Sequence, residues 1–287
     1  MSDPVRAILL LGNYRPALTL ARNLNSKGWH VIVGRQGCDG GCEYSRAVAE
    51  MWDHPDPSRG KAAFFKALKQ FVLERPEIKS VFPVAEEYVR LFCEHPEEMN
   101  RLPSVVTVAP ETVNTCLDKM AMLKLADESQ VPTAAYAEAK SGPELYGVLE
   151  RIGYPSILRS LVSTVRLDGK KAVTVRNAQD VAKLEINWAD LPAGVVAQRK
   201  FTGRRHNFYF AAYQGQLIRQ LHAVILRTDR PDGSGLAVEG MTVEPDPDLR
   251  RHTEALLKGL SYSGIGCAQY LVDEDTGATS FLEINPR

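Results

Sequence analysis

The stretches Gly266-Cys-Ala-Gln-Tyr-Leu-Val-Asp273 and Ser280-Phe-Leu-Glu-Ile-Asn-Pro-Arg287 decide the fold of this chain. Both are rich in apolar and aromatic residues, which is typical of strands. Glu274-Asp-Thr-Gly277 follows the first stretch, and its Asp and Gly suit a tight turn. We therefore expect residues 266–287 to form a β-hairpin.

Three polar side chains on this hairpin are candidate metal ligands. Because successive side chains of a strand point to opposite faces, Glu283 and Asn285 share one face. Gln269 joins them if the hairpin pairs in an even register, and lies on the other side in an odd register. One carboxylate and two amide carbonyls are the oxygen ligands that Mg²⁺ accepts. The other interpretation is that these side chains are simply exposed to solvent at the end of the strand and hold no metal.

The first part of the chain has the pattern of a parallel α/β domain. The apolar run at 7–11 predicts a buried strand, the apolar spacing over 15–27 predicts a helix, and 29–33 predicts a second strand. Strand-helix-strand units of this kind build parallel sheets. The alternation continues with helices expected at 61–74 and 86–94 and strands at 80–83 and 105–108. We expect this domain to end near residue 110.

The remainder of the chain predicts two further parts. The expected elements of residues 111–190 are helices at 111–129, 142–152 and 179–185 and strands at 134–138, 153–159 and 173–175, with Ser141 as a helix cap. The expected elements of residues 191–287 are strands at 195–201, 207–213, 216–226, 267–273 and 280–284 and a helix at 248–261. This last part therefore has the pattern of a mostly antiparallel α+β unit.

Composition excludes several classes of protein. The 35 Lys+Arg residues balance 35 Asp+Glu residues, so bulk charge supplies no attraction for nucleic acid or an anionic membrane. No apolar run reaches the roughly 18 residues that span a bilayer, and the run at 7–11 is too short for an export signal. Five cysteines fit reduced thiols better than a disulfide framework. These observations predict a soluble cytoplasmic protein.

The hairpin resembles a known metal-binding element. Its end, Phe281-Leu-Glu-Ile-Asn-Pro-Arg287, is similar to the metal-binding strand of the ATP-grasp superfamily, and within it to the ATP-binding units of the carbamoyl-phosphate synthetase large subunit and related carboxylate-amine ligases. The resemblance implies that Glu283, Asn285 and Gln269 hold Mg²⁺ or Mn²⁺. It also implies that Arg287 faces the transferred phosphate.

Upstream segments extend this resemblance over the whole chain. Asp118-Lys119 and Gly153-Tyr-Pro-Ser-Ile-Leu-Arg159 are similar to the family's two phosphate-contacting positions, which implies that Lys119 and Arg159 bind the polyphosphate. An Arg at the second position favours the synthetase-like branch. Val195-Val-Ala-Gln-Arg-Lys-Phe201 resembles the hinge that receives adenine, and Phe82-Pro-Val-Ala-Glu-Glu87 resembles the leading α/β domain. The hinge residues so implied are Gln198, Arg199, Lys200 and Phe201.

The resemblance also implies an architecture and a reaction. It implies a pre-ATP-grasp α/β domain with a parallel sheet at 1–110, followed by a two-lobed α+β ATP-grasp domain with lobes at 111–190 and 191–287. The second lobe is expected to be truncated at its C-terminus. The implied enzyme is an ATP-dependent ligase that forms an acylphosphate on a substrate carboxylate for attack by an amine or another nitrogen nucleophile. Its partners would be small molecules, without nucleic acid or membrane, and two-fold association as a homodimer fits soluble proteins of this kind.

Two departures from the family pattern favour an alternative. Residues 160–171 contain one glycine where relatives have a glycine-rich phosphate loop, although Ser163, Thr164 and Lys170 could replace some donors. Phe208 stands where the synthetase has a Glu for the ribose hydroxyls, with His206 and Asn207 beside it. A degenerate ATP-grasp protein that binds nucleotide or ligand without turnover is therefore the second hypothesis.

Other motifs predict no separate site. Gly12-Asn13-Tyr14 has one glycine where a dinucleotide fingerprint needs three. Cys38-Asp-Gly-Gly-Cys42 lacks the second ligand pair of a zinc site. The basic residues within 199–206 are interpreted as a rim that faces phosphate or as a solvated surface.

Overall fold

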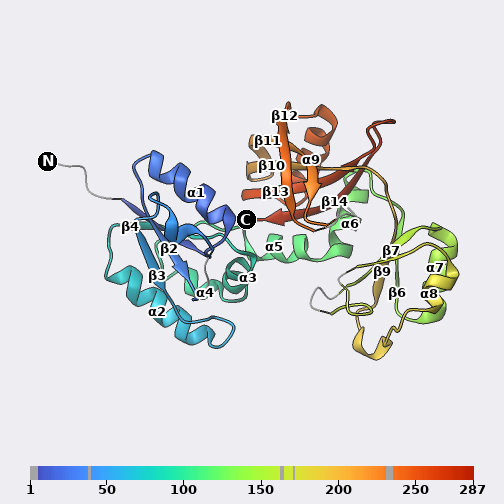
Figure 1. Ribbon diagram of the computed structural model, residues 1–287, viewed down its shortest axis with the longest axis horizontal. Helices are drawn as coiled ribbons and strands as arrows, with labels where there is room; N and C mark the ends of the chain where they lie inside the picture. Colours follow the sequence, from blue (N-terminus) through green and yellow to red (C-terminus); the bar gives the residue numbers. More distant parts are fainter. Residues whose placement is uncertain (1–5, 38–39, 162–164, 171, 231–234) are drawn as a thin grey trace. The chain divides into compact units, whose positions relative to one another are not determined.

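The computed structural model describes residues 6–37, 40–161, 165–170, 172–230 and 235–287. It divides into two compact units (Figure 1). The first contains Met1–Asn114, Ser263–Ile265 and Pro286–Arg287, and the second contains Thr115–Tyr262 and Gly266–Asn285. Within the described ranges, no helix has both the length and the apolar character needed to cross a membrane.

The first unit contains the expected parallel sheet. Five strands lie in the order β3-β2-β1-β4-β5, and every neighbouring pair is parallel. The strands are β1 (Ala7–Leu11), β2 (His30–Arg35), β3 (Glu50–Asp53), β4 (Ile78–Pro83) and β5 (Ser104–Val105). They alternate with α1 (Arg15–Ser26), η1 (Cys42–Tyr44), α2 (Lys61–Leu73), α3 (Glu86–Glu94) and α4 (Pro96–Met99).

β1 is apolar along its whole length because both faces of the sheet are covered. Leu9 belongs to a core that includes Phe64 of α2 and Phe92 of α3. Its neighbour Leu10 points to the other face and belongs to the core that includes Ala17 of α1. A strand covered on both faces shows a continuous apolar run rather than an alternating one, which explains why the run at 7–11 predicted it correctly.

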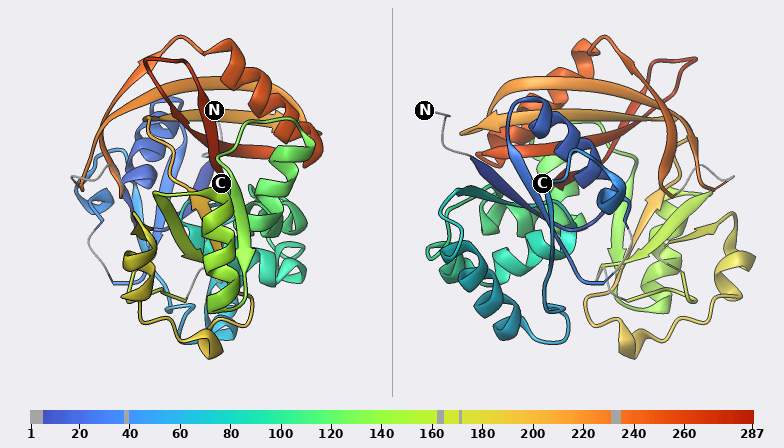
Figure 2. Two further views of the ribbon diagram at one scale, coloured as in Figure 1. Left: turned by 90° about the vertical axis from the view of Figure 1, so that its right-hand side faces the viewer. Right: turned by 60° about the vertical axis from the view of Figure 1, so that its left-hand side comes forward.

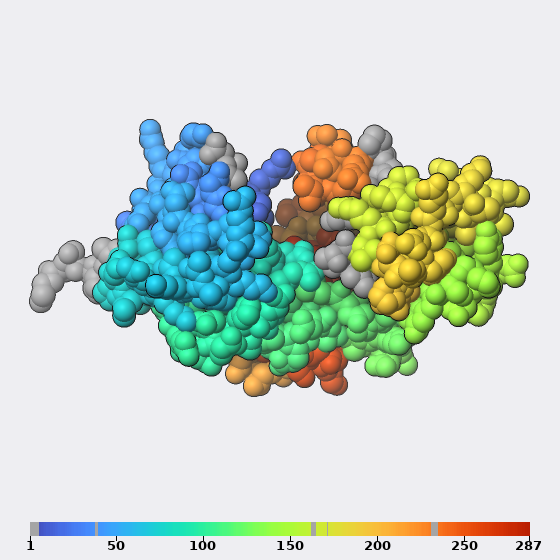
Figure 3. Space-filling model, turned by 90° about the horizontal axis from the view of Figure 1, so that it is seen from below, coloured from blue at the N-terminus to red at the C-terminus, as the bar shows by residue number. Residues whose placement is uncertain are grey.

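The second unit begins with a four-stranded antiparallel sheet in the order β6-β9-β7-β8. Its strands are β6 (Tyr136–Ala139), β7 (Ser156–Ser160), β8 (Val173–Val175) and β9 (Val195–Arg199), and α7 (Gly142–Ile152), α8 (Ala178–Ala182) and η2 (Trp188–Asp190) accompany them. Leu158 of β7 and Leu149 of α7 are fully buried in the same core. Figure 3 shows the surface of this part, from lime at α7 to gold near η2. Helix α7 therefore covers one face of this sheet.

A second sheet of this unit has the order β12-β11-β10-β13-β14. Its strands are β10 (Arg204–Tyr213), β11 (Gln216–Thr228), β12 (Ala237–Val243), β13 (Gly264–Val272) and β14 (Thr279–Pro286). Helix α9 (Pro247–Gly259) packs on one face, where the rings of Phe210 and Tyr262 meet edge to face at 5.1 Å between centroids. In the views of Figure 2, α9 lies on the side of this sheet turned away from β6, β7 and β9.

The single helix expected at 111–129 is wrong. The structure has α5 (Pro110–Leu117) and α6 (Lys119–Glu128), with Asp118 in an extended conformation between them. The Asp118 carboxylate accepts hydrogen bonds from the backbone N–H groups of Met120 and Ala121, at 2.9 and 3.0 Å. An aspartate that captures these donors caps a new helix instead of continuing the previous one.

Other elements differ from the expectations as well, and β3 and α4 of the first unit correspond to no expected element. β9 falls within the part expected at 191–287, yet it pairs with β6 and β7 of the preceding part. β12 corresponds to no expected element, and six of its seven residues are exposed. Without burial on one face, β12 has no alternation of apolar and polar residues for sequence reasoning to detect.

Candidate functional site

β14 carries the two central candidate metal ligands. The side-chain Nδ2 of Asn285 donates a hydrogen bond to Oε1 of Glu283 at 3.0 Å. The two groups therefore share a face of the strand, and Glu283 is exposed while Asn285 is half-buried. Their remaining oxygens supply a carboxylate and an amide carbonyl side by side, which is a donor set that a hard cation accepts.

Gln269 lies on β13, the strand next to β14 in the sheet, and is half-buried. The rings of Tyr270 and Phe281 contact each other across these strands at 5.7 Å between centroids. Sets of three or more His, Cys, Asp or Glu residues placed to hold a metal do not occur in the described residues. A metal site here would therefore depend on amide oxygens as well as on the single carboxylate.

Arg287 follows β14 and groups with the first unit, whereas the other candidate residues of the hairpin group with the second. Its backbone N–H donates to the carbonyl of Ile265 at 3.1 Å. Its guanidinium Nη1 donates to the carbonyl of Pro286 at 3.3 Å. The half-buried side chain is thus turned back along its own strand.

Arg159 lies on the face of the β6–β9 sheet opposite α7. Along β7, Leu158 points into the core with α7, so Arg159 and Ile157 point the opposite way. Burial lowers the pKa of the Arg159 guanidinium, and the negative charge of Glu283 raises it. The charge of the predicted metal ligand Glu283 therefore acts on the predicted second phosphate residue, although the two belong to different sheets.

The hinge residues fall into two groups. Gln198 pairs with Ile157 on the neighbouring strand, which places its side chain on the face of Arg159. Arg199 points to the opposite face, since a Cβ added at Gly153 would lie 2.9 Å from its Nη1 atom. Lys200 is exposed and Phe201 is half-buried. Among the four hinge side chains, Gln198 is therefore the one that shares a face with Arg159 by strand pairing.

Only some backbone groups of the hinge form hydrogen bonds with the neighbouring strands. The N–H of Arg199 donates to the carbonyl of Ala135 at 2.7 Å, and the N–H of Lys200 donates to the carbonyl of Pro155 at 2.9 Å. Proline has no N–H, so Pro155 cannot return a hydrogen bond to the carbonyl of Lys200. That carbonyl is consequently an acceptor which the neighbouring strand cannot satisfy.

Lys119 is the first residue of α6 and is half-buried. Its position is fixed by the Asp118 cap, because the cap sets where the helix begins. A lysine at the start of a helix lies beside the positive end of the helix dipole, a place that favours a bound anion.

Tyr136 is a residue that sequence reasoning did not select. It pairs with Gln198 across β6 and β9, so it lies on the same face. Its hydroxyl donates to Oδ2 of Asp127 at 2.5 Å, and burial, together with this hydrogen bond, raises the pKa of the Tyr136 hydroxyl. The sequence did not indicate that β9 pairs with β6, and only that pairing brings Tyr136 beside the hinge.

Phe208, at which the sequence departs from the synthetase pattern, is a core residue. Phe208 is fully buried and pairs with His222 on β11. His222 accepts a hydrogen bond at Nδ1 from the backbone N–H of Asp246, the residue that caps α9, at 3.2 Å. Phe208 therefore faces α9, and its neighbour Asn207 faces the opposite side of the sheet.

His206 and His222 form a buried pair, with 2.9 Å between Nδ1 of His206 and Nε2 of His222. Burial lowers the pKa of both imidazoles, and for His206 the nearby His222 lowers it further. Both rings lie on the face of the β10–β14 sheet that α9 covers. They belong to the packing of that helix rather than to the face that Asn207 occupies.

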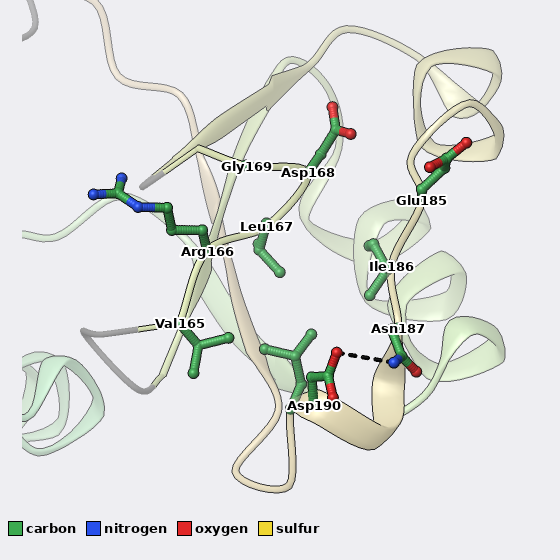
Figure 4. Close-up of a pocket in the computed structure, with 10 residues that line it drawn as sticks. Val165, Arg166, Leu167, Asp168, Gly169, Glu185, Ile186, Asn187 and Asp190 are labelled. Carbon is green, nitrogen blue, oxygen red and sulfur yellow. Dashed lines mark hydrogen bonds between the residues drawn. The ribbon is translucent and has the colours of Figure 1, made fainter.

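A pocket of about 310 Å³ lies elsewhere in the second unit. Figure 4 shows it between residues 165–169 and 185–191, with Asn187 donating to Asp190 at 2.8 Å. Among the residues described, three carboxylates, those of Asp168, Glu185 and Asp190, line it with the single cation Arg166, and no candidate site residue does. Because carboxylates repel phosphate, this pocket does not suit a nucleoside triphosphate.

Three residues named in the sequence analysis lie outside the described residues; they are Ser163, Thr164 and Cys38. Lys170 closes a tight turn in which its N–H donates to the carbonyl of Leu167 at 2.8 Å, so this donor is already used. In the described part of the chain the thiols are in no disulfide; they are Cys42, Cys93, Cys116 and Cys267.

Comparisons with known proteins agree on the fold. No protein-family model matches the chain. The bifunctional purine synthesis protein purC/E of Dictyostelium discoideum is 27% identical over 121 residues, which are 42% of this chain and 12% of that protein. The chain therefore spans only a small part of this curated relative.

Solved structures match almost the whole chain. Biotin carboxylase from Campylobacter jejuni, in a β-γ-ATP complex, matches with a TM-score of 0.72 and 17% identity over 99% of this chain and 66% of that chain. N5-carboxyaminoimidazole synthetase from Staphylococcus aureus, complexed with ADP, matches with a TM-score of 0.66 and 13% identity over 100% of this chain and 72% of that chain. The chain therefore has the fold of the ATP-grasp ligases.

Proposed function

We propose that the chain is an ATP-dependent carboxylate-amine ligase. The observation that carries the proposal is the Glu283–Asn285 pair of β14, joined by a hydrogen bond of 3.0 Å, whose carboxylate charge acts on the buried Arg159 guanidinium of β7. A fixed guanidinium binds phosphate oxygens, and a carboxylate paired with an amide binds a hard cation. A metal-bound polyphosphate needs both kinds of group in one place.

The architecture we propose has three parts. The parallel sheet of the first unit is the pre-ATP-grasp domain, near residues 1–110. The β6–β9 sheet with its helices is the first ATP-grasp lobe, and the β10–β14 sheet with α9 is the second. Relative to bounds of 111–190 and 191–287, the first lobe also takes β9, because that strand pairs with β6 and β7.

In this proposal the nucleotide lies on the face of the β6–β9 sheet that carries Arg159, opposite α7. Arg159 and Lys119 bind the polyphosphate, with Arg159 able to make bidentate contact. The carbonyl of Lys200 accepts from the adenine amino group, which gives a role to an acceptor that Pro155 leaves unpaired. Arg199 contributes through its backbone, since its side chain points to the other face.

Glu283, Asn285 and Gln269 would hold Mg²⁺ or Mn²⁺. A bound divalent cation neutralises phosphate charge during transfer. The substrate carboxylate attacks the γ-phosphorus and ADP leaves, giving an acylphosphate. The nitrogen nucleophile then attacks the acyl carbon and phosphate leaves. Arg287 is assigned to the transferring phosphoryl group.

The test is release of ADP from Mg-ATP in the presence of pooled amino acids and small carboxylates. We expect one pool to raise turnover, and Glu283→Gln to reduce it by about 100-fold or more, as is typical when a charge-stabilising group is lost. Glu274→Gln is the matched control, because Glu274 lies on the same hairpin and pairs with Arg204 at 3.1 Å. Unchanged turnover in Glu283→Gln would remove the metal assignment.

A second candidate is a protein that binds nucleotide without turnover. The observation in its favour is the single glycine in residues 160–171, where a phosphate loop would need several. Tight Mg-ATP binding with no ADP formed in a single turnover, under every substrate pool, would favour this candidate over the ligase.

We further propose that the chain acts in the cytoplasm on small molecules, without nucleic acid or membrane, and that it forms a homodimer. The neutral balance of 35 Lys+Arg and 35 Asp+Glu supports the absence of a nucleic-acid partner. Light scattering after size-exclusion chromatography tests the dimer, and a mass of one chain would overturn it.

A further inference from the structure

The linker between α6 and β6 is bonded to two different sheets at neighbouring residues. The N–H of Ala134 donates a hydrogen bond to the side-chain Oγ of Ser280 on β14 at 3.0 Å. The carbonyl of Ala135 accepts one from the N–H of Arg199 on β9 at 2.7 Å. The chain therefore passes from the β10–β14 sheet to the β6–β9 sheet within two residues, and residues 132–135 are called the junction.

Backbone and side chain both hold the junction on β14. The N–H of Phe281 donates to the carbonyl of Pro132 at 2.8 Å, beside the bond from Ala134 to Ser280. β14 is an edge strand of its sheet, so the junction covers the edge where a further strand would pair. Ser280 and Phe281 are 1% and 0% exposed. The Ser280 hydroxyl is therefore a buried group whose oxygen is used by the junction.

The other side of the junction is held by α6. The Asp127 carboxylate, near the end of this helix, accepts from the hydroxyl of Thr133 at 3.3 Å and from the hydroxyl of Tyr136 at 2.5 Å. One carboxylate thus bonds to residues before and after Ala134. Because α6 fixes the junction from that side, the two bonds to β14 set where the junction lies on that strand. Ser280 supplies the one that depends on a side chain.

The junction connects the elements that carry the proposed nucleotide groups. β6 begins directly after it and pairs with β9, whose Gln198 lies on the face of Arg159. Glu283 lies three residues after Ser280 on β14. The chain also joins the two sheets covalently, through residues 200–203 between β9 and β10. Two bodies joined at one point can rotate about it, and the junction is a second attachment that restricts this rotation.

We propose that Ser280 is a positioning residue of the nucleotide site: its hydroxyl holds the junction on β14, so that the proposed metal ligands of this strand meet the polyphosphate bound by Arg159. This inference rests on the proposed function. Loss of the hydroxyl leaves the Ala134 N–H without this acceptor and loosens the second attachment between the sheets. A displacement of about 1 Å between cooperating groups is enough to weaken their joint effect strongly.

The test is calorimetric binding of ATP with Mg²⁺ and of ATP in EDTA, without other substrates. The metal-linked gain is the dissociation constant in EDTA divided by that in Mg²⁺. We expect the gain of the wild-type chain to exceed about tenfold, because a cation held by β14 also binds phosphate oxygens. Ser280→Ala should reduce the gain several-fold, the effect of one hydrogen bond, and leave the affinity for ATP in EDTA nearly unchanged. A variant that only unfolds more readily keeps the same gain, since unfolding weakens both affinities equally.

Thr253→Ala is the matched control, because the Thr253 hydroxyl is also fully buried and donates to the carbonyl of Leu249 at 2.7 Å within α9. It should lower stability and keep the gain. Ser280→Cys fills the same space with a weaker acceptor and should reduce the gain, so it decides the question if Ser280→Ala does not fold. In the Glu283→Gln background Ser280→Ala should cause no further loss, because Ser280 acts through the metal ligands.

A gain unchanged in Ser280→Ala, or in Ser280→Cys if the first variant does not fold, overturns the inference and leaves the proposed function intact. An equal reduction in Thr253→Ala, or a further loss in the Glu283→Gln background, has the same meaning. A wild-type chain without a metal-linked gain overturns the metal assignment and the inference with it. Failure to bind ATP under either condition overturns the proposed function.

Discussion

Glu283 on β14 raises the pKa of the Arg159 guanidinium on β7, against the lowering that burial causes. The two residues lie on different sheets of one compact unit. An opposite charge stabilises the charged form of a buried guanidinium. The guanidinium can still bind an anion, such as a polyphosphate, that carries its own metal ion.

Arg159→Ala should weaken Mg-ATP binding by about 10- to 100-fold, because hydrogen bonds to charged groups contribute about 1.5–3 kcal/mol. Arg159→Lys should lose less, since it keeps the charge and loses only the bidentate geometry. Calorimetric dissociation constants provide the measurement, with Arg151→Ala on the exposed face of α7 as the control. Equal affinity in wild type and Arg159→Ala would show that the polyphosphate binds elsewhere.

Asp118→Ala should lower the free energy of unfolding by about 1 kcal/mol, the usual cost of losing an N-cap. The carboxylate bonds to the N–H groups of Met120 and Ala121, and alanine leaves both without that partner. Asp118→Asn should retain most of the stability because asparagine is also a good cap. Urea unfolding measures the effect, and equal losses in the two variants would argue against capping as its cause.

Gly40→Ala should destabilise the chain strongly. A Cβ at residue 40 would lie 1.7 Å from the backbone oxygen of Asn13, so the backbone must move. Gly60→Ala is the matched control, because its Cβ would meet Ala63 at an ordinary 3.7 Å. We expect a loss of more than about 2 kcal/mol in the first variant and less than about 1 kcal/mol in the second, measured by urea unfolding.

Stability should fall as the pH drops below about 6.5, the ordinary pKa of histidine. Burial lowers the pKa of four imidazoles in the folded chain, so the unfolded state takes up protons first; they are His54, His206, His222 and His252. Each contributes up to about 1.4 kcal/mol per pH unit, present above pH 6.5 and lost below it.

Urea midpoints at pH 7.5 and pH 5.5 measure this loss, in a range above the titration of most carboxylates. His54→Gln removes one titrating group whose Nε2 lies 3.1 Å from the hydroxyl of Tyr88. It should reduce the difference between the two midpoints even if it lowers both of them. An undiminished difference would exclude His54 from the pH dependence.

Burial decided which elements the sequence could predict. β1 was predicted closely because a strand buried on both faces has a continuous apolar run. α3 was predicted closely because a helix buried on one face has an amphipathic repeat. The break at Asp118 depends on a side chain that bonds to the backbone, and the pattern of apolar residues does not record such a bond. β12 is exposed, so no alternation marks it.

The candidate site was predictable only where a residue's face follows from its own strand. Glu283 and Asn285 are two residues apart on β14, and their shared face follows from alternation alone. The face of Gln198 depends on which strands flank β9, and Tyr136 becomes relevant only through the same pairing. The burial of Phe208 depends on where α9 packs, which the sequence pattern does not record.

The composition of the first unit bears on how the chain folds during synthesis. Most of this unit is the segment Met1–Asn114, yet Ser263–Ile265 and Pro286–Arg287 also belong to it. A ribosome makes those segments long after residue 114, so the leading sheet can form early while its unit is completed only when residues 286–287 have emerged. Contacts of such long sequence separation slow folding, and a fragment ending at residue 114 would lack part of its own unit.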